Sequence, residues 1–208
     1  MNVSRGVFAD SKAGGNGGAI ALINMSPLHS FFANSLFVRN SASSGSAFFG
    51  DDADFINSTV DSNSGLALLN SAPSRSPRHV TFRNSIVSNN LHGGCGPTGL
   101  FDDESTNHNL QFPGNDCGAT VRVADPHLDT MYIPLPMSPP MGNGDMDICM
   151  MQPVNGRDIY GLGRPSGKGC TIGAAEGDIQ FLINRRSKKV DDANLLKKLQ
   201  QLLPTGGN

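Results

Sequence analysis

Short runs in which apolar and polar residues alternate recur along the first part of the chain, and three of them contain the pair Asn-Ser. Each of these three begins on an apolar residue, and a short β-prone run and a further Asn follow the pair. The copies are Phe32–Asn40, Phe55–Asn63 and Val80–Asn90, with a weaker copy at Arg5–Ser11. The steps between equivalent positions are 29, 23 and 27 residues, within the range of stacked repeats. The equivalent positions are Arg5, Asn34, Asn57 and Asn84.

The alternation predicts half-buried strands that stack on one another. Within Val80–Arg83 the apolar Val80 and Phe82 alternate with polar residues, which is the period of a strand with one buried face. A single strand cannot bury that face, but a column of similar strands can. The sequence therefore predicts an all-β fold of parallel coils. The alternative is a β-sandwich whose short strands are evenly spaced.

The asparagines of the Asn-Ser pairs are predicted to mark a corner between strands. Asparagine and glycine tolerate the left-handed backbone that a sharp bend requires. Stacked asparagines can also pass a hydrogen bond from one side-chain amide to the next. We therefore expect a structural asparagine ladder formed by Asn34, Asn57 and Asn84. The phenylalanines of the repeats are expected to stack inside the coils.

The repeat pattern divides the chain into three parts. Residues 1–135 are predicted to hold the coils, with a loop insertion at 91–118. Residues 136–176 are irregular and rich in Pro, Gly and Met, and we expect them to form a C-terminal cap. Residues 177–208 are predicted to form a linker and a short amphipathic α-helix, because leucines recur there at i, i+1, i+4, i+7 and i+8. This helix has three interpretations: a solvated tail, a cap over a coil end, or a partner-binding element.

Composition and charge argue against several classes of protein. The chain has 16 basic and 18 acidic residues, so no basic field points to nucleic acid. It contains no apolar run of about 18 residues that would span a membrane. Residues 1–5 lack the pattern that opens a signal peptide. Few charged residues alongside many Asn, Ser and Gly are typical of an exported β-rich protein.

Four cysteines allow three disulfide pairings. Pairing Cys95 with Cys117 and Cys149 with Cys170 would close one irregular loop each. A loop of this length stabilises a fold by about 3 kcal/mol in the chain-entropy model. Buried free thiols are the alternative. A zinc site is not expected, because no Cys-x-x-Cys pair occurs and the five histidines show no ligand spacing.

The stretch from Cys149 to Glu176 contains Asn155–Gly161, then Arg164-Pro165, and then Cys170–Glu176. This order resembles the C-terminal signature of the bacterial choice-of-anchor Q domain proteins, approximately C…D-x-x-G-x-x-R-P…C-D-I-G-A-x-E, and the Asn-Ser repeats resemble that family's coils. The resemblance covers residues 1–176. It implies a right-handed parallel β-helix of the pectate-lyase type with about four or more coils, held at the cell surface or secreted. It also supports the two local cysteine bridges. Thr171 departs from the pattern, which has Asp at that position.

Arg164 and Glu176 are predicted to cap the coils structurally. A stack of strands ends in unpaired backbone groups, which recruit other chains unless they are covered. We expect Arg164 to pair with Glu176 or Asp158 over such an end. At the other end Met1 lies almost inside a repeat, so we hypothesise upstream coils or a partner subunit there.

Acidic clusters are the candidates for chemistry. Asp51–Asp54 and Asp102–Glu104 could gather a hard cation through their carboxylate oxygens, and solvated acidic turns are the alternative. Gly14–Ala19 is similar to the calcium-binding repeat of β-rolls but lacks its Asp. No nucleophile elbow and no His-Glu-x-x-His motif occurs. The sequence thus assigns no catalytic residue, no metal ligand and no cofactor.

Three classes of function remain. The first is a non-catalytic surface module, an adhesin or scaffold that displays loops such as His29-Ser30, Asp51–Asp54 and residues 71–78 and contacts polysaccharide or other cell-surface components. The second is a polysaccharide lyase or a glycoside hydrolase. Glycoside hydrolysis needs paired carboxylates, and the sequence does not reveal acids in register on one face. The third is a structural subunit that assembles end to end. The fold alone does not choose between them.

Overall fold

The computed structural model describes residues 1–22, 29–71, 79–96, 101–102, 108–165 and 169–177. Their regular secondary structure is almost entirely β-strand, and the helix among them is the short α1 (Met146–Met150). No helix among them is long and apolar enough to cross a membrane. The predicted helix in 177–208, the loop at 72–78 and Asp103-Glu104 lie outside the described residues.

The strands form three sheets. Sheet A holds, in spatial order, β1 (Asn2–Ser4), β4 (Ser30–Ala33), β7 (Ala53–Ile56), β10 (Val80–Arg83) and β12 (Phe101–Asp102). Sheet B holds β2 (Val7–Ala9), β5 (Leu36–Val38), β8 (Thr59–Asp61), β11 (Ile86–Ser88), β13 (Leu110–Phe112) and β14 (Arg122–Val123). Sheet C holds β3 (Ile20–Ala21), β6 (Ser41–Gly50) and β9 (Ser64–Asn70).

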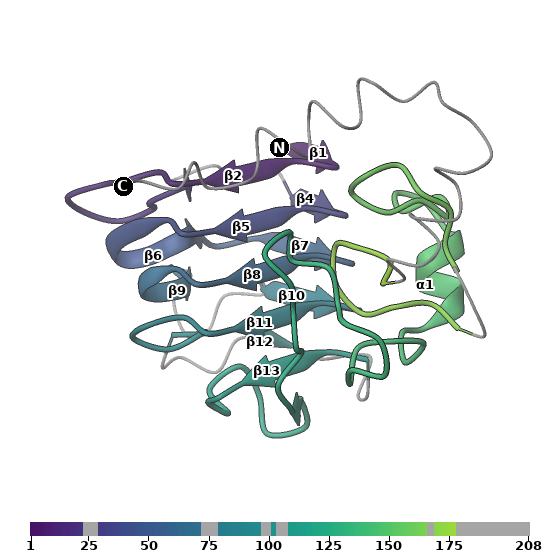
Figure 1. Cartoon of the computed structure of the whole chain (residues 1–208). Coiled ribbons are helices and arrows are strands. Elements are labelled where there is room, and N and C mark those ends of the chain that lie inside the picture. The colour runs from purple at the N-terminus through teal and green to yellow at the C-terminus, as the bar shows by residue number, and fades with distance from the viewer. Residues whose placement is uncertain (23–28, 72–78, 97–100, 103–107, 166–168, 178–208) are drawn as a thin grey trace, which may run out of the picture.

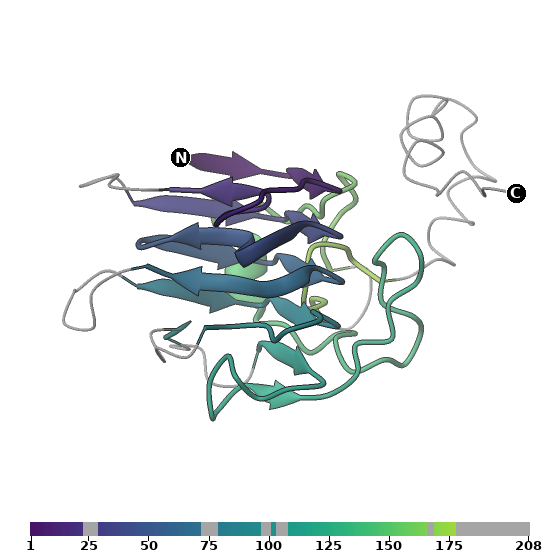
Figure 2. The same ribbon diagram turned by 90° about the vertical axis from the view of Figure 1, so that its left-hand side faces the viewer.

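All paired strands of these sheets run parallel. From β1 to β9 the chain visits sheets A, B and C in turn and then returns to A one strand further along, so that the strands lie in tiers (Figures 1 and 2). The prediction of parallel stacking is therefore confirmed, and the sandwich alternative is wrong. β12 and β13 extend sheets A and B from within the predicted insertion at 91–118.

The strand register agrees with the repeat equivalence drawn from the sequence. Ser4, Ala33, Ile56 and Arg83 form one row across sheet A. The residue after each of them has a left-handed backbone, with φ of 48° at Asn34, 45° at Asn57 and 50° at Asn84. Asparagine occupies this corner because it tolerates that conformation better than most side chains.

A main core is built from side chains of all three sheets. Its members include Phe32 of sheet A, Phe37 of sheet B and Phe48 of sheet C, each fully buried. Phenylalanines stack from tier to tier, with ring centroids 5.2 Å apart between Phe32 and Phe55 and 5.5 Å apart between Phe55 and Phe82. These distances are close to the spacing of neighbouring strands, about 4.8 Å. The predicted aromatic stacking is confirmed.

The C-terminal segment, residues 131–176, lies along the side of the stack (Figure 1). Its Ile133 and Ala174 pack on Leu36 and Val38 of β5, and its Ile172 packs on Ile86 of β11. The predicted plug over one end of the coils is thus not what the described residues form. The physical reason is that β5 and β11 carry apolar residues on both faces, so the outward face of sheet B also needs cover.

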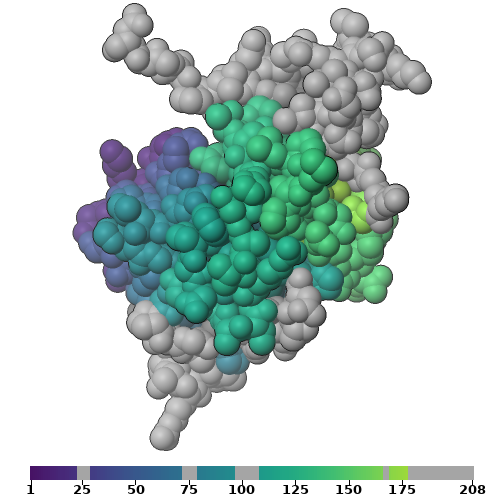
Figure 3. Space-filling model, turned by 60° about the horizontal axis from the view of Figure 1, so that its bottom comes forward, coloured from purple at the N-terminus to yellow at the C-terminus, as the bar shows by residue number. Residues whose placement is uncertain are grey.

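A different segment covers the end of the stack next to β13, and Figure 3 shows it from below. Gln111 continues the inward row of Phe37, Val60 and Val87. Its Nε2 donates to the carbonyls of Gly118 and Val121 (2.9 and 3.0 Å), and its Oε1 accepts from the Cys117 N–H (2.9 Å). The turn that carries Cys117 is thereby held against the core.

Candidate functional site

The outward face of sheet A carries the row that is best suited to contact a ligand. Phe31, Asp54 and Thr81 stand next to one another on β4, β7 and β10. All three are half-buried, whereas the following residue of each strand is a buried phenylalanine. The Phe31 ring is partly covered, because it packs against the cluster of Ala33, Ile56 and Val154. The row places this ring, a carboxylate and a hydroxyl on adjacent strands.

His29 lies beside this row and contacts two carboxylates. Its Nδ1 is 2.7 Å from Asp52 Oδ1, and its Nε2 is 3.1 Å from Asp54 Oδ2. Thr81 Oγ1 donates a hydrogen bond to the other oxygen of Asp54. Because carboxylates accept hydrogen bonds and both ring nitrogens face one, the doubly protonated imidazolium satisfies both contacts.

The electrostatics of this cluster favour the charged histidine. Partial burial lowers the pKa of His29, but the hydrogen bonds and the charges of Asp52 and Asp54 together raise it above its ordinary value of 6.5. The cluster therefore changes its hydrogen bonding when the pH rises past that raised pKa, because one ring nitrogen then loses its proton.

The acidic residues that the sequence singled out are distributed between a turn and a strand. Asp52 precedes β7, and Asp54 lies within it. Both of these carboxylates are directed at His29. In the part of the chain that the structure describes, no three His, Cys, Asp or Glu side chains are arranged to hold a metal ion.

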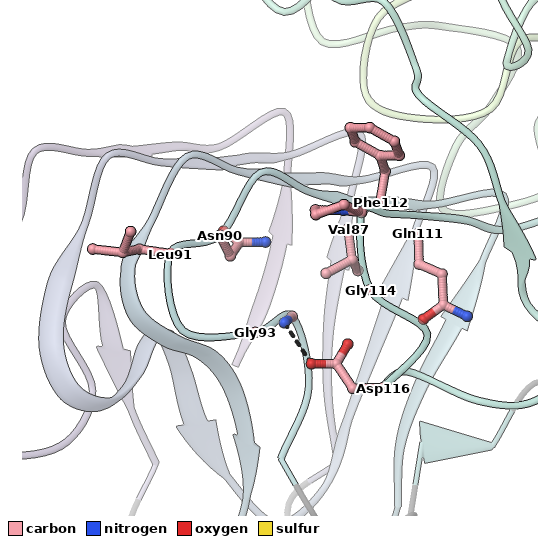
Figure 4. A pocket seen from close by; sticks show the side chains of 10 residues that line it. Val87, Asn90, Leu91, Gly93, Gln111, Phe112, Gly114 and Asp116 are labelled. Carbon is pink, nitrogen blue, oxygen red and sulfur yellow. Dashed lines mark hydrogen bonds between the residues drawn. The ribbon is translucent and has the colours of Figure 1, made fainter.

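A small cavity of about 240 Å³ lies at the covered end of the stack (Figure 4). Asp116 forms one wall, and its Oδ2 accepts a hydrogen bond from the Gly94 N–H at 2.9 Å. Gln111 forms another wall, with its amide engaged by the turn that it holds. The polar side chains of this cavity thus serve the local fold. The lining residues are Val87, Asn90, Leu91, Gly93, Gly94, Gln111, Phe112, Pro113, Gly114 and Asp116.

The three asparagines of the first corner differ from the predicted ladder. Asn84 Nδ2 lies 3.4 Å from Asn57 Oδ1, but among the described residues no hydrogen bond joins Asn57 to Asn34. Instead all three contact the C-terminal segment. Asn34 donates to the Val154 carbonyl (3.4 Å), Asn57 to that of Thr171 (3.4 Å) and Asn84 to that of Asp145 (2.9 Å). The reason is that the segment supplies carbonyls at this corner.

A continuous asparagine ladder forms at the second corner, between sheets B and C. Asn40 Nδ2 donates to Asn63 Oδ1 at 3.0 Å, and Asn63 Nδ2 donates to Asn90 Oδ1 at 2.9 Å. The backbone N–H groups of Asn40 and Asn63 donate to the same two oxygens. The signal for this ladder is the second Asn of each repeat, in register with the first. The first column keeps one rung of the predicted ladder, from Asn84 to Asn57.

The serines of the Asn-Ser pairs form a parallel ladder. The Ser35 N–H donates to Ser58 Oγ at 3.3 Å, and the Ser58 N–H donates to Ser85 Oγ at 3.0 Å. The serine hydroxyls in turn donate hydrogen bonds to backbone carbonyls of sheet A. The repeated pair is thus accounted for by satisfied backbone groups at a corner.

Arg164 and Glu176 form a buried ion pair within the C-terminal segment. Arg164 Nη1 is 3.1 Å from Glu176 Oε2, and both side chains are inaccessible to solvent. Arg164 also donates to the carbonyls of Thr171 (2.8 Å), Gly173 and Ala174 (both 2.7 Å). Burial raises the pKa of Asp158, which accepts the N–H of Glu176 at 3.1 Å. These groups organise the segment internally and lie beside the stack.

The four cysteines form two disulfides, Cys95–Cys117 and Cys149–Cys170, and none is free. The first joins the core at the covered end, and the second lies at the asparagine corner. Comparisons of the chain with protein-family models, curated proteins and solved structures find no match.

Proposed function

We propose that the protein is a non-catalytic extracellular module, a right-handed parallel β-helix that presents the outward face of sheet A to carbohydrate. The observation that carries this proposal is the row formed by Phe31, Asp54 and Thr81. An aromatic ring offers an apolar platform to the C–H face of a sugar. The carboxylate and hydroxyl beside it can hydrogen-bond sugar hydroxyls.

The role of His29 supports binding over catalysis. Glycoside hydrolysis needs two carboxyl groups that act separately as acid and as base or nucleophile, on either side of a scissile bond. Asp52 and Asp54 instead share one imidazole. Two carboxylates that face one imidazole are placed to accept hydrogen bonds and not to stand on either side of a scissile bond.

The disulfides support an extracellular location. Such bonds persist in oxidising compartments and are rare in the cytosol. Together with the ladders at the corners they make a rigid support, and a rigid surface loses little entropy when it binds. The proposed family relationship to the choice-of-anchor proteins rests on the sequence order in Cys149–Glu176 and on the Asn-Ser repeats.

A glycoside hydrolase is a second candidate because of one register. Asp102 lies in the same row as Thr81 and Asp54, two strands from Asp54. A hydrolase would release new reducing ends, which a binding module does not.

The test measures binding and turnover on the same panel of neutral and anionic polysaccharides. We expect retention without new reducing ends or double bonds, and at least a fivefold weaker affinity for Phe31→Ala and for Thr81→Ala. Leu91→Ala, an exposed apolar residue beside the cavity of Figure 4, is the matched control and should bind normally. Turnover abolished by Asp54→Asn or Asp102→Asn would establish the hydrolase instead, and absence of both binding and turnover would reject both candidates.

A further inference from the structure

We propose that the Cys149–Cys170 disulfide is a redox-sensitive latch, which a dithiol reduces in preference to Cys95–Cys117 and whose reduction loosens the C-terminal segment from the asparagine corner. The inference rests on the hydrogen-bond donors that surround these sulfurs. It is independent of the sugar-binding role of sheet A.

Two asparagine amides of the first corner point at Cys149. Asn57 Nδ2 and Asn84 Nδ2 each lie 3.4 Å from its Sγ. Acceptors lie farther from Cys149 than these two donors, with Asn57 Oδ1 at 3.7 Å from its Sγ. At Cys170 the Thr171 carbonyl lies 3.6 Å from Sγ, nearer than the Asn57 amide (3.9 Å) and Arg164 Nη1 (3.8 Å). Disulfide sulfur is a weak acceptor, so these donors gain most when the sulfur becomes a thiolate.

The surroundings of Cys95–Cys117 do not favour a thiolate. This bond belongs to the apolar core, together with Leu68 and Val87. Among the described residues, the carboxylate of Asp116 lies beside this bond, with Oδ1 at 3.7 Å from Cys117 Sγ. An apolar environment and a neighbouring negative charge both disfavour a thiolate.

The physical consequence concerns the equilibrium between dithiol and disulfide. A disulfide becomes a better oxidant when its reduced form is stabilised. The amide donors at Cys149 stabilise the reduced form with its thiolate there, whereas the core around Cys95 and Cys117 does not. The reduction of Cys149–Cys170 should therefore need a weaker reductant.

The reaction is thiol–disulfide exchange with a dithiol. A thiolate of the dithiol attacks Cys170 Sγ, the Cys149–Cys170 bond breaks, and Cys149 leaves as a thiolate beside Asn57 and Asn84. The second thiol of the dithiol then attacks the mixed disulfide and releases Cys170. Two electrons and two protons pass to the protein, and the dithiol becomes a cyclic disulfide.

Both sulfurs are 0 % exposed, so the reductant reaches them through local opening of the segment. Cys149 lies in α1, and the backbone of Cys170 pairs with Gly144 in an isolated β-bridge. The disulfide therefore connects α1 to that bridge. Its loss leaves hydrogen bonds between this corner and the segment, among them those from Asn34, Asn57 and Asn84 to the carbonyls of Val154, Thr171 and Asp145.

The experiment is an equilibrium titration of the folded protein with reduced and oxidised dithiothreitol, followed by alkylation and peptide mass spectrometry. We expect the equilibrium constant for reduction of Cys149–Cys170 by dithiothreitol to be about tenfold larger than that of Cys95–Cys117. This ratio corresponds to a difference of about 30 mV between the two reduction potentials. If Cys95–Cys117 is reduced first, or both together, the proposal is wrong. This comparison needs no variant.

Asn57→Gly and Asn84→Gly test the cause, because glycine keeps the left-handed backbone of this corner and removes the amide. We expect each to make Cys149–Cys170 three- to tenfold harder to reduce. Simple loosening of the fold predicts the reverse, easier reduction. Asn34→Gly is the matched control, since Asn34 shares the corner but bonds a carbonyl, and it should leave the equilibrium unchanged. Should one glycine variant fail to fold, the other decides the matter.

Discussion

Asparagine has a different task at each of the two corners of a tier. At the first corner it supplies a left-handed backbone at Asn34, Asn57 and Asn84 and donates outward to the C-terminal segment. At the second corner the left-handed residue comes first, and the following Asn turns inward to bond its neighbours above and below. The same side chain thus fastens a segment at one corner and stabilises the stacking at the other.

Asn63 is the central member of the inward ladder, and Asn63→Ala should be strongly destabilising. The change removes the acceptor of the Asn40 N–H and side-chain amide and the donor to the Phe37 carbonyl. Buried groups left unpaired cost about 1–3 kcal/mol each. We therefore expect the free energy of unfolding in urea to fall by about 3 kcal/mol. Ser43→Ala is the control, since Ser43 is exposed and bonds a single carbonyl, and a similar loss there would contradict the ladder's role.

His29 should make stability depend on pH. Its pKa is raised in the folded protein above 6.5, so its contribution is fully present below pH 6.5 and is lost as the pH rises through the folded pKa. We expect the free energy of unfolding to fall as the pH rises above 6.5 and through the raised pKa, and this step to be absent in His29→Gln. An NMR titration of the imidazole gives the folded pKa directly. A value at or below 6.5 would contradict the ion pairs with Asp52 and Asp54.

At the scale of elements, the two segments without regular sheet structure perform separate tasks. The turn after β13 covers the interior at one end, held by Gln111 and Cys95–Cys117. The C-terminal segment covers the outward face of sheet B. Each segment carries one disulfide. A segment without the regular hydrogen bonds of a sheet is stabilised most by such a cross-link.

Gln111→Ala tests the end cover. The change leaves the Cys117 N–H and the carbonyls of Gly118 and Val121 without their buried partners. We expect the free energy of unfolding to fall by about 3 kcal/mol. Asn115→Ala, an exposed change in the same turn, should cost little. Equal effects of the two changes would show that the turn does not depend on Gln111.

The repeats of the sequence are enough to predict their strands and the order in which they stack. In each repeat apolar and polar residues alternate with phenylalanine on the buried face, and such strands bury that face together when they stack in a column. It also contains the signal for the lateral cover, since Leu36–Val38 and Ile86-Val87 are apolar on both faces, a pattern of strands buried on both sides. That signal was not used. The contact of His29 with Asp52 and Asp54 could not be predicted from the repeat pattern. It joins the residue before β4 to residues at the start of β7 in the next tier.

At the scale of the whole molecule, the stack and the C-terminal segment differ in how they are held. The central strands bond neighbours on both edges and bury aromatic side chains on their inner face. The segment from Asp145 to Glu176 is held by its ion pair, by the carbonyl contacts at the asparagine corner and by Cys149–Cys170. Regions with fewer backbone pairings open at lower free energy than core strands.

This difference predicts how each disulfide affects amide hydrogen exchange. In Cys149→Ser/Cys170→Ser, exchange should accelerate by about 100-fold across residues 145–176, because a closed loop of this length contributes about 3 kcal/mol, while β4–β8 stay protected. In Cys95→Ser/Cys117→Ser, the acceleration should appear at β13 and the turn after it, and the two variants serve as controls for each other. The measurement is exchange under native conditions, read by mass spectrometry. Uniform acceleration across all strands in both variants would mean that segment and stack unfold as one unit, since two separately stabilised parts respond only where their own cross-link is removed.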